Sequence, residues 1–424
     1  MERIRVKIKK LGRVVDSEIE IAPLMIFSGE SGMGKSYLAL LVHYFYDVLI
    51  VSDRSPRLAF LFEYLKYDYK EMAKSFRGEG VALTITKQDI ERWMEEDAVN
   101  YLRFMLNSDG LEGKIKVALP NIIPDSIVLT YKEEYTGLVN NEDVDIVLGI
   151  NDIGYRVSHS AINDTTPYAA VLAAFLTKCL FGSIFGLRST FNMPPSRGPV
   201  LSENMTGNSG MYKDFIADMI DLSNVPPIPN SSSELLLKQL FTIMEGEVKK
   251  ENNKFMYHTN GVSMPISAAA ASIREIAPLQ ILASRWNISN TAVLIEEPEA
   301  HLHPSKQRMM ADIIGCIRKA GAHVHLTTHS DYFLQRINEL ILFERYVSTH
   351  EQNDIKQLEK LTGISSEYSV NPDDLVAYLV LRQENGSSLV VRQEMKQGVP
   401  FTSFSGAVRE SMRVRDVLEE AIGL

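Results

Sequence analysis

The chain has 424 residues, of which 45% are apolar and 23% are charged, and this mixture excludes a disordered, collagen-like or heptad-dominated protein. The length predicts two or three lobes. The 54 acidic and 44 basic residues give a net charge of −10, which argues against a surface that coats nucleic acid or an anionic membrane. With two cysteines and no charged-then-apolar leader at Met1, the expected compartment is the cytoplasm.

The first fifty residues predict a β hairpin, a buried strand and a helix. Basic and apolar side chains alternate over residues 3–9, and a second alternating run follows the turn at residues 11–13. Residues 24–27 (LMIF) form a continuous apolar run, which is typical of a strand in a parallel sheet, and a helix is expected over about 35–51. One face of the hairpin is basic and consists of Arg3, Arg5, Lys7 and Lys9. This face could contact a DNA backbone or an acidic protein, but we favour the interpretation that it protects an edge strand from aggregation.

The middle of the chain predicts helices, then strands, then one apolar helix. Residues 53–107 have a helical pattern, and residues 114–159 change to a period of two, which predicts antiparallel strands. The apolar stretch 168–187 approaches the length of a membrane span, but Lys178 in its middle favours a buried core helix. A short strand is expected over 189–193.

The last part of the chain predicts further helices, strands and a hairpin. The polar stretch 224–233 is the expected loop or linker. The elements expected after it are a helix over 234–250, a hairpin turning at Asn260-Gly261, a helix over 268–284, a strand over 292–295, a helix over 303–320 and a strand over 323–327.

Residues 29–36 (GESGMGKS) fit the pattern G-x-x-x-x-G-K-[ST] between a predicted buried strand and a predicted helix. The glycines allow successive N–H groups to converge on an anion, and the helix N-terminus adds its dipole. Lys35 is expected to reach the β- and γ-phosphates, and Ser36 to bind Mg²⁺. The predicted nucleotide-binding residues are therefore Gly29, Glu30, Ser31, Gly32, Met33, Gly34, Lys35 and Ser36.

Two further motifs end predicted strands with polar side chains. Residues 293–298 (VLIEEP) place two carboxylates at the C-terminal end of an apolar strand, where ligands bind in open α/β sheets. Because adjacent strand residues point in opposite directions, Glu296 is predicted to bind the metal and Glu297 to face the attacking water. The strand over 323–327 ends in Thr-His-Ser, which predicts a γ-phosphate role for His329. Catalytic roles are thus predicted for Glu297, His329 and Lys35.

The motifs GESGMGKS, EEPEAHLHP and TTHS together resemble the ATP-binding-cassette (ABC) class of P-loop ATPases, and more narrowly its OLD (overcoming lysogenization defect) and RecF/SMC-like branch. Residues 370–404 resemble the tail of stand-alone antiphage-defence ATPases of the PARIS kind. The resemblance implies that Lys35 and Ser36 are the Walker A pair, Glu296 the Walker B acid, Glu297 the catalytic glutamate and His329 the switch histidine.

The resemblance also implies three less regular features. The segment FNMPPSRG makes Arg197 a candidate contact to nucleotide or to the opposing subunit. The signature loop, which grips the γ-phosphate of a partner subunit in this class, falls within residues 266–275 and lacks the usual glycine pair. There Ser267 or Ser272 either makes this contact in trans or only caps a helix. Residues 300–303 occupy the place of the D-loop.

The fold class that follows is α/β, an ABC-type ATPase head with a mixed P-loop core sheet, an N-terminal antiparallel β lobe and a helical and β insertion. Four segments are expected. They are a hairpin and P-loop over 1–52, the insertion over 53–160, the second half of the ATPase core over 161–345 and an α/β cap over 346–424.

By resemblance, the leading hypothesis is a regulatory ATPase of an antiphage defence system that uses ATP and Mg²⁺. It would form a head-to-head dimer or higher oligomer, respond to a phage protein and control a separate nuclease or toxin effector, without a membrane partner. The alternative is a RecF/SMC-like repair ATPase that binds DNA. A transporter's nucleotide-binding subunit comes third, because the signature segment departs from the transporter pattern.

Overall fold

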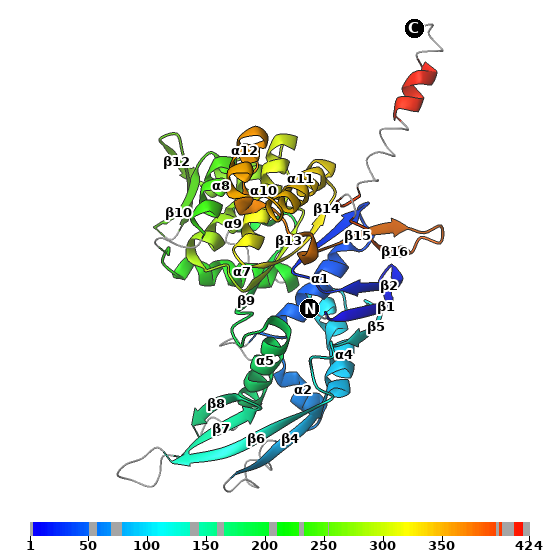
Figure 1. Cartoon of the computed structure of the whole chain (residues 1–424), viewed down its shortest axis with the longest axis vertical. Coiled ribbons are helices and arrows are strands. Elements are labelled where there is room, and N and C mark those ends of the chain that lie inside the picture. Colours follow the sequence, from blue (N-terminus) through cyan, green and yellow to red (C-terminus); the bar gives the residue numbers. More distant parts are fainter. Residues whose placement is uncertain are drawn as a thin grey trace. The chain divides into compact units, whose positions relative to one another are not determined.

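The computed structural model divides the chain into two compact units (Figure 1). The first unit comprises Met1–Ile21, Leu40–Phe191 and Asn290–Val293, and the second comprises Ala22–Ala39, Asn192–Ser289 and Leu294–Leu424. The fold class is α/β, as predicted, with a mixed sheet and further antiparallel sheets. The structure describes residues 3–50, 57–68, 79–135, 144–158, 165–202, 210–228, 233–252, 254–395, 398–400 and 411–418.

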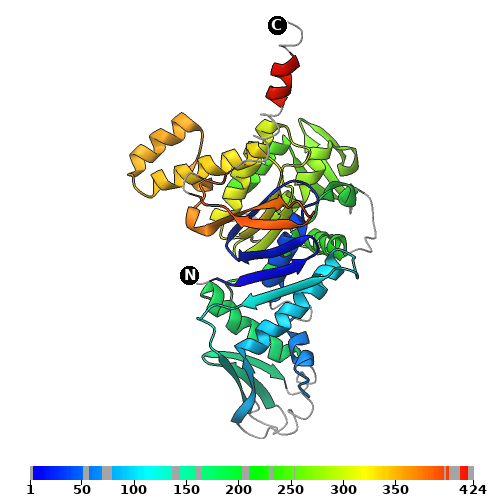
Figure 2. The same cartoon turned by 90° about the vertical axis from the view of Figure 1, so that its right-hand side faces the viewer.

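The predicted hairpin opens the first unit. β1 (Arg5–Leu11) pairs antiparallel with β2 (Val14–Glu20), and its other edge pairs antiparallel with β5 (Gly113–Ala118) (Figure 2). Apolar side chains of β1 are buried and its basic side chains are exposed, which confirms the predicted two-faced pattern. The favoured explanation, protection of an edge strand, is wrong, because β1 has a paired strand on both edges.

A second antiparallel sheet of the first unit has the order β4-β6-β7-β8. Three of these strands confirm the predicted change of period: β6 (Ser126–Tyr135), β7 (Val144–Ile150) and β8 (Ile153–Ser158). The helical prediction for 53–107 is wrong at β4 (Glu79–Thr86), because its alternating residues pair with β6 along its whole length, with Ile85 opposite Ile127. Residues 53–56, 69–78, 136–143 and 159 of these predictions lie outside the described residues.

Two helices of the first unit have a recognisable cap at one end. α2 (Ala59–Tyr64) is short, and α4 (Lys87–Met105) begins with a capping box. The apolar stretch forms α5 (Thr166–Phe181), which packs against β7 and β8 and ends at Gly182 in a left-handed conformation with φ 77°. Its Lys178 pairs with Asp152. In the part of the chain that the structure describes, no helix has the length and apolar character that a membrane crossing needs.

The second unit is built on a mixed sheet with β3 (Leu24–Gly29) at its centre. β3 is buried throughout and lies between two parallel neighbours, β14 (His323–Thr328) and β15 (Leu375–Arg382). This arrangement confirms the predicted parallel strand. β16 (Ser388–Arg392) pairs antiparallel with β15, and β13 (Thr291–Glu296) and then β9 (Ser189–Met193) follow β14.

β15, from late in the sequence, therefore pairs with the strand that leads into the P-loop. Tyr378 of β15 stacks on Phe27 of β3, with ring centroids 5.6 Å apart and an interplanar angle of 15°. β15 thus belongs to the same sheet as β3. The division of the chain into four segments, over 1–52, 53–160, 161–345 and 346–424, remains a prediction.

Helices surround this sheet and support a small antiparallel sheet. β10 (Glu247–Glu251), β11 (Lys254–Thr259) and β12 (Val262–Pro265) form that sheet, and the last two turn at Asn260-Gly261 as predicted. The helices of the second unit are α6 (Arg197–Ser202), α7 (Gly210–Asn224), α8 (Glu234–Met244), α9 (Ala271–Arg285), α10 (Pro304–Lys319), α11 (Asp331–Val347) and α12 (Gln352–Thr362). α1 (Lys35–Asp47) begins in the second unit and continues into the first.

The predicted helix over 234–250 is wrong after Met244. Glu245 has a left-handed φ of 57°, which ends α8, and residues 247–251 pair with β11 instead. A Cβ at Gly246 would lie 2.2 Å from the carbonyl oxygen of His258, so only glycine allows the chain to turn here into the strand. Of the predicted linker, residues 229–232 lie outside the described residues.

Candidate functional site

The loop between β3 and α1 has the backbone that its glycines predict. Gly29, Gly32 and Gly34 have φ values of 131°, 74° and 98°, which L side chains rarely adopt. At Gly29 an added Cβ would also lie 2.4 Å from the carbonyl oxygen of Val380 in β15. These glycines therefore allow the loop to curl tightly over the start of α1.

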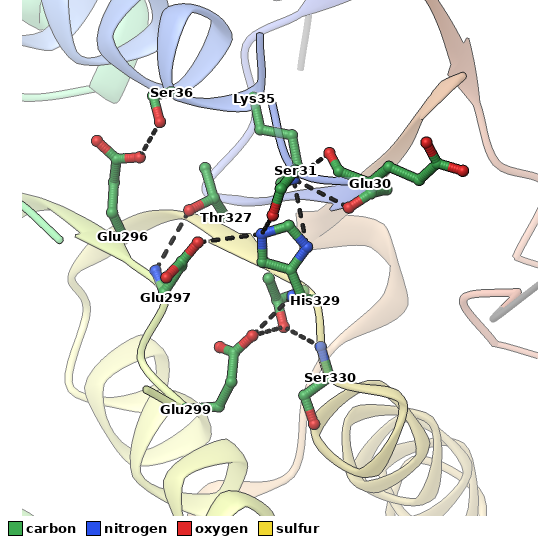
Figure 3. A network of polar contacts seen from close by, with 12 residues as sticks. Glu30, Ser31, Lys35, Ser36, Glu296, Glu297, Glu299, Thr327, His329 and Ser330 are labelled. Atoms are coloured by element: carbon green, nitrogen blue, oxygen red, sulfur yellow. Dashed lines mark hydrogen bonds and ion pairs between the residues drawn. The ribbon is translucent and has the colours of Figure 1, made fainter. Parts of the chain in front are cut away.

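Lys35 lies inside this loop (Figure 3). Its Nζ donates to the carbonyl oxygens of Gly29 at 2.9 Å and Glu30 at 2.7 Å, and lies 3.4 Å from Nδ1 of His329. Burial lowers the pKa of Lys35 to about 8, although the nearby carboxylates oppose this shift. The ammonium is thus held by neutral carbonyls at a place where phosphate oxygens would give it an anionic partner.

Ser36 and Glu296 form a direct pair between α1 and the end of β13. The hydroxyl of Ser36 donates to Oε2 of Glu296, and Glu296 is only 2% exposed. Burial raises the pKa of Glu296 to about 7. Its Oε1 is buried and has no hydrogen-bond partner among the described residues. A hydroxyl beside a buried carboxylate oxygen with no partner is a donor set that suits Mg²⁺, which prefers oxygen ligands.

Glu297 and His329 face each other across the ends of β13 and β14 (Figure 3). Glu297 has a left-handed φ of 46°, unusual for a residue with a side chain, and its N–H donates to the Thr327 carbonyl at 3.1 Å. Its Oε1 lies 3.0 Å from Nε2 of His329, and this hydrogen bond lowers the pKa of Glu297. Nε2 also lies 3.3 Å from Oγ of Ser31. The side chain of Glu297 is 40% exposed, so the two adjacent glutamates face different environments.

Glu299 is a site residue to which the motifs assigned no role. Its Oε1 accepts hydrogen bonds from Oγ1 of Thr328 and from the N–H of His329, both at 2.7 Å. The side chain is 7% exposed, and burial raises its pKa. The signal in the sequence was the third glutamate of EEPE, close to two predicted site residues. The strand that carries its hydrogen-bond donors cannot be identified from spacing.

Arg197 has a different place from the predicted contact with nucleotide or an opposing subunit. It is 2% exposed, and its Nη1 donates to the carbonyl oxygens of Glu296 at 2.9 Å and Pro194 at 3.2 Å. Nε donates to the carbonyl oxygen of Glu275 at 2.8 Å, and the two side chains form an ion pair at 3.7 Å. Arg197 therefore holds the end of β13 to α9 from inside the protein.

The predicted signature serines lie at the start of α9. Ser267 belongs to the short 3-10 helix Ile266–Ala268 and is exposed, and Ser272 lies in the first turn of α9. The N-cap residue is Ala270, and no side chain caps this helix. The capping alternative is therefore wrong for both serines, while a contact with a partner subunit remains a prediction.

Comparison with known proteins gives one family match. Residues 212–334 match the model of a family described as the AAA ATPase domain. The matched range contains Glu296, Glu297, Glu299 and His329 but not the P-loop. No curated protein matches the sequence. The glycine-rich loop and this match, which covers less than a third of the chain, both support an ATPase domain.

The solved structures that match this chain include three heads of SMC proteins. One is bound to the C-terminal winged-helix domain of ScpA; it is 12% identical, with a TM-score of 0.38, and 93% of this chain and 98% of that chain are covered. A head domain from Thermotoga maritima is 10% identical, with a TM-score of 0.34 and coverage of 93% and 100%. A Pyrococcus furiosus head bound to the C-terminal domain of ScpA is 11% identical, with a TM-score of 0.38 and coverage of 98% and 100%.

The burial of Glu296 predicts a pH-dependent stability. With a folded pKa of about 7 against an ordinary value of 4.5, the folded protein holds more protons at this site than the unfolded chain across that window. The contribution of Glu296 to the free energy of unfolding therefore falls as the pH rises from 4.5 through 7. Glu296→Gln removes this titration, and we expect the stability of the variant relative to wild type to rise by about 1–3 kcal/mol between about pH 5 and about pH 8.

Urea unfolding of the metal-free proteins at several pH values measures this difference. Glu247→Gln, on the surface strand β10, is the matched control and should keep a constant difference from wild type. A constant difference for Glu296→Gln as well would show that Glu296 does not titrate in this window.

Proposed function

We propose that this chain is a Mg²⁺-dependent ATPase whose site lies in the second unit. The observation that carries the proposal is the convergence of Lys35, Ser36, Glu296, Glu297 and His329 at one edge of the sheet (Figure 3). They come from the ends of β13 and β14 and from the start of α1, although some 260 residues separate Ser36 from Glu296 in the sequence. The AAA ATPase match over residues 212–334 supports the same activity.

The loop and Lys35 bind the phosphates in this proposal. The backbone of residues 29–36 presents N–H groups, and Lys35 exchanges the carbonyls of Gly29 and Glu30 for phosphate oxygens. Ser36 and Glu296 hold Mg²⁺, which neutralises charge on the phosphates when it is bound.

Glu297 and His329 act on the water and on the γ-phosphate. The lowered pKa of Glu297 keeps its carboxylate ionised at neutral pH, so that it accepts a hydrogen bond from the attacking water and orients it. The tautomer of His329 that donates from Nε2 to Glu297 leaves Nδ1 as acceptor for Lys35. His329 thereby links the water-positioning carboxylate to the phosphate-binding lysine.

The start of α9 is proposed to complete the site of a second copy. Ala270 leaves the first N–H groups of α9 without a side-chain cap, and Ser267 beside it is exposed. Such a helix start, with Ser267 or Ser272, attracts an anion such as the γ-phosphate held by a partner subunit. ATP binding would then close a head-to-head dimer, and hydrolysis would open it.

The biological role is proposed from resemblance. The motifs of the site and residues 370–404 resemble stand-alone antiphage-defence ATPases, which favours a separate nuclease or toxin as the protein that this ATPase restrains. A phage protein is the trigger that fits this role. Co-purification of the neighbouring gene products with the chain, with and without ATP, tests it.

Lys35→Ala is expected to lower the affinity for ATP by about 10-fold to 100-fold, because the phosphates lose charge-assisted hydrogen bonds. Titration with a fluorescent ATP analogue measures the affinity. Lys249→Ala removes an exposed lysine of β10 and should bind ATP as wild type does. Unchanged ATP binding by Lys35→Ala would mean that the nucleotide site is elsewhere.

Glu297→Gln is expected to bind ATP normally but to hydrolyse it at least about 100-fold more slowly, because the amide is a poor acceptor for the proton of water. The variant should accumulate the closed oligomer with ATP, measured by light scattering after gel filtration. Glu245→Gln, which changes an exposed glutamate, is the control. Wild-type turnover by Glu297→Gln would remove this residue from the catalytic role.

A second candidate function is DNA binding by the first unit. The exposed face of β1 and β5 carries Arg5, Lys7 and Lys9 beside Lys114 and Lys116, with Lys7 directly opposite Lys116. Like charges opposite each other on a sheet are unfavourable, and a phosphate backbone would neutralise them. Glu95 pairs with Lys116 and offsets part of this charge.

Changing Arg5 and Lys7 together to Glu is expected to weaken any DNA affinity. The plot of log association constant against log salt concentration should become less steep by about 2, one for each lost phosphate contact. Fluorescence anisotropy with a labelled duplex, with and without ATP, measures both quantities. Lys356→Glu with Lys360→Glu makes a similar change of charge on α12 and is the control. Equal loss in both variants would indicate only a general effect of net charge.

A further inference from the structure

Glu299 connects the turn after β13 to the histidine at the end of β14. Its Oε1 accepts two hydrogen bonds of 2.7 Å, one from Oγ1 of Thr328 and one from the N–H of His329. One carboxylate oxygen therefore binds the side chain of one residue and the backbone of the next, and Figure 3 shows this contact below the imidazole.

The Thr-His-Ser turn after β14 is held on its other side by the first turn of α11. The N–H of Ser330 donates to Oγ1 of Thr328 at 3.0 Å, and the hydroxyl of Ser330 accepts the N–H of Phe333 at 3.0 Å as the helix cap. The backbone of His329 thus lies between two fixed points, Glu299 and the start of α11.

The imidazole of His329, in contrast, is contacted among the described residues by polar groups that are expected to move when nucleotide binds. These groups are Glu297 at 3.0 Å, Ser31 at 3.3 Å and Lys35 at 3.4 Å. With 32% of the side chain exposed, the ring is not fixed by packing alone. Its direction therefore depends on the position of its backbone, which the Glu299 carboxylate sets.

We propose that Glu299 is a positioning residue for ATP hydrolysis that acts through His329. The inference rests on the proposed ATPase function. This role gives a reason for a buried carboxylate that costs stability. Glu299 is 7% exposed and lies beside two other glutamates, and its second oxygen, Oε2, has no hydrogen-bond partner among the described residues. The alternative is that Glu299 only stabilises the turn.

A double-mutant cycle separates these two roles. Steady-state ATP hydrolysis is measured for wild type, Glu299→Ala, His329→Ala and the double variant. We expect Glu299→Ala to lower kcat by about 10-fold and to change KM by less than about threefold, but to lower kcat by less than about twofold when His329 is already alanine. Equal losses in both backgrounds would overturn the proposal.

Glu299→Gln tests whether the acceptor geometry is what matters. Its amide oxygen still accepts from Thr328 and His329, so we expect a kcat within about threefold of wild type. Thr328→Val removes one of the two donors and should show the same dependence on His329, which provides a second cycle if Glu299→Ala does not fold. Thermal unfolding of each variant identifies such a failure.

The position of the ring is also measured without ATP hydrolysis. In ¹H–¹⁵N spectra of the nucleotide-free protein, the imidazole signals that disappear in His329→Ala belong to His329. We expect these signals to shift in Glu299→Ala and to stay in place in Glu299→Gln. Unchanged signals in Glu299→Ala would overturn the proposal even if the protein hydrolyses no ATP. If the wild-type protein hydrolyses no ATP but the signals shift as expected, only the ATPase function is overturned.

Discussion

The site depends on the compensation of negative charge at the end of β13. Glu296, Glu297 and Glu299 lie within four residues, and two of them are almost fully buried. Buried carboxylates cost several kcal/mol each unless hydrogen bonds or cations compensate them. Each glutamate here has its own partner. Ser36 donates to Glu296, His329 contacts Glu297, and Thr328 and the His329 N–H donate to Glu299.

Strand register determines that these partners meet. In the parallel pairing of β3 with β14, Ser28 lies opposite Thr328, so the P-loop and the Thr-His-Ser turn leave the sheet at the same level. Arg197 then holds the end of β13 through the carbonyl oxygen of Glu296, and its charge pairs with Glu275 inside the protein. The parallel strands within this mixed sheet thus bring residues from four distant segments to one edge.

The parts of the fold that are encoded by local pattern could be predicted from the sequence. The buried strand β3, the glycine loop, the two glutamates of β13 and the histidine after β14 each follow from a short motif with its own period or spacing. β4 was missed because its pairing partner lies some forty residues further on, and β10 because a single left-handed residue, Glu245, ends the helix before it. The roles of Arg197 and Glu299 could not be predicted, because both depend on contacts across the sheet.

The place of β15 also bears on how the protein is made. The strand that leads into the P-loop is synthesised long before its two sheet neighbours, because β14 and β15 follow it by more than 290 residues. β3, which is buried throughout in the folded protein, therefore remains without these two partners until the later residues have been made, a state in which strands tend to aggregate. Val380 of β15 pairs with Gly29 at the start of the glycine-rich loop, so this loop reaches its folded surroundings only after residue 380 has been made.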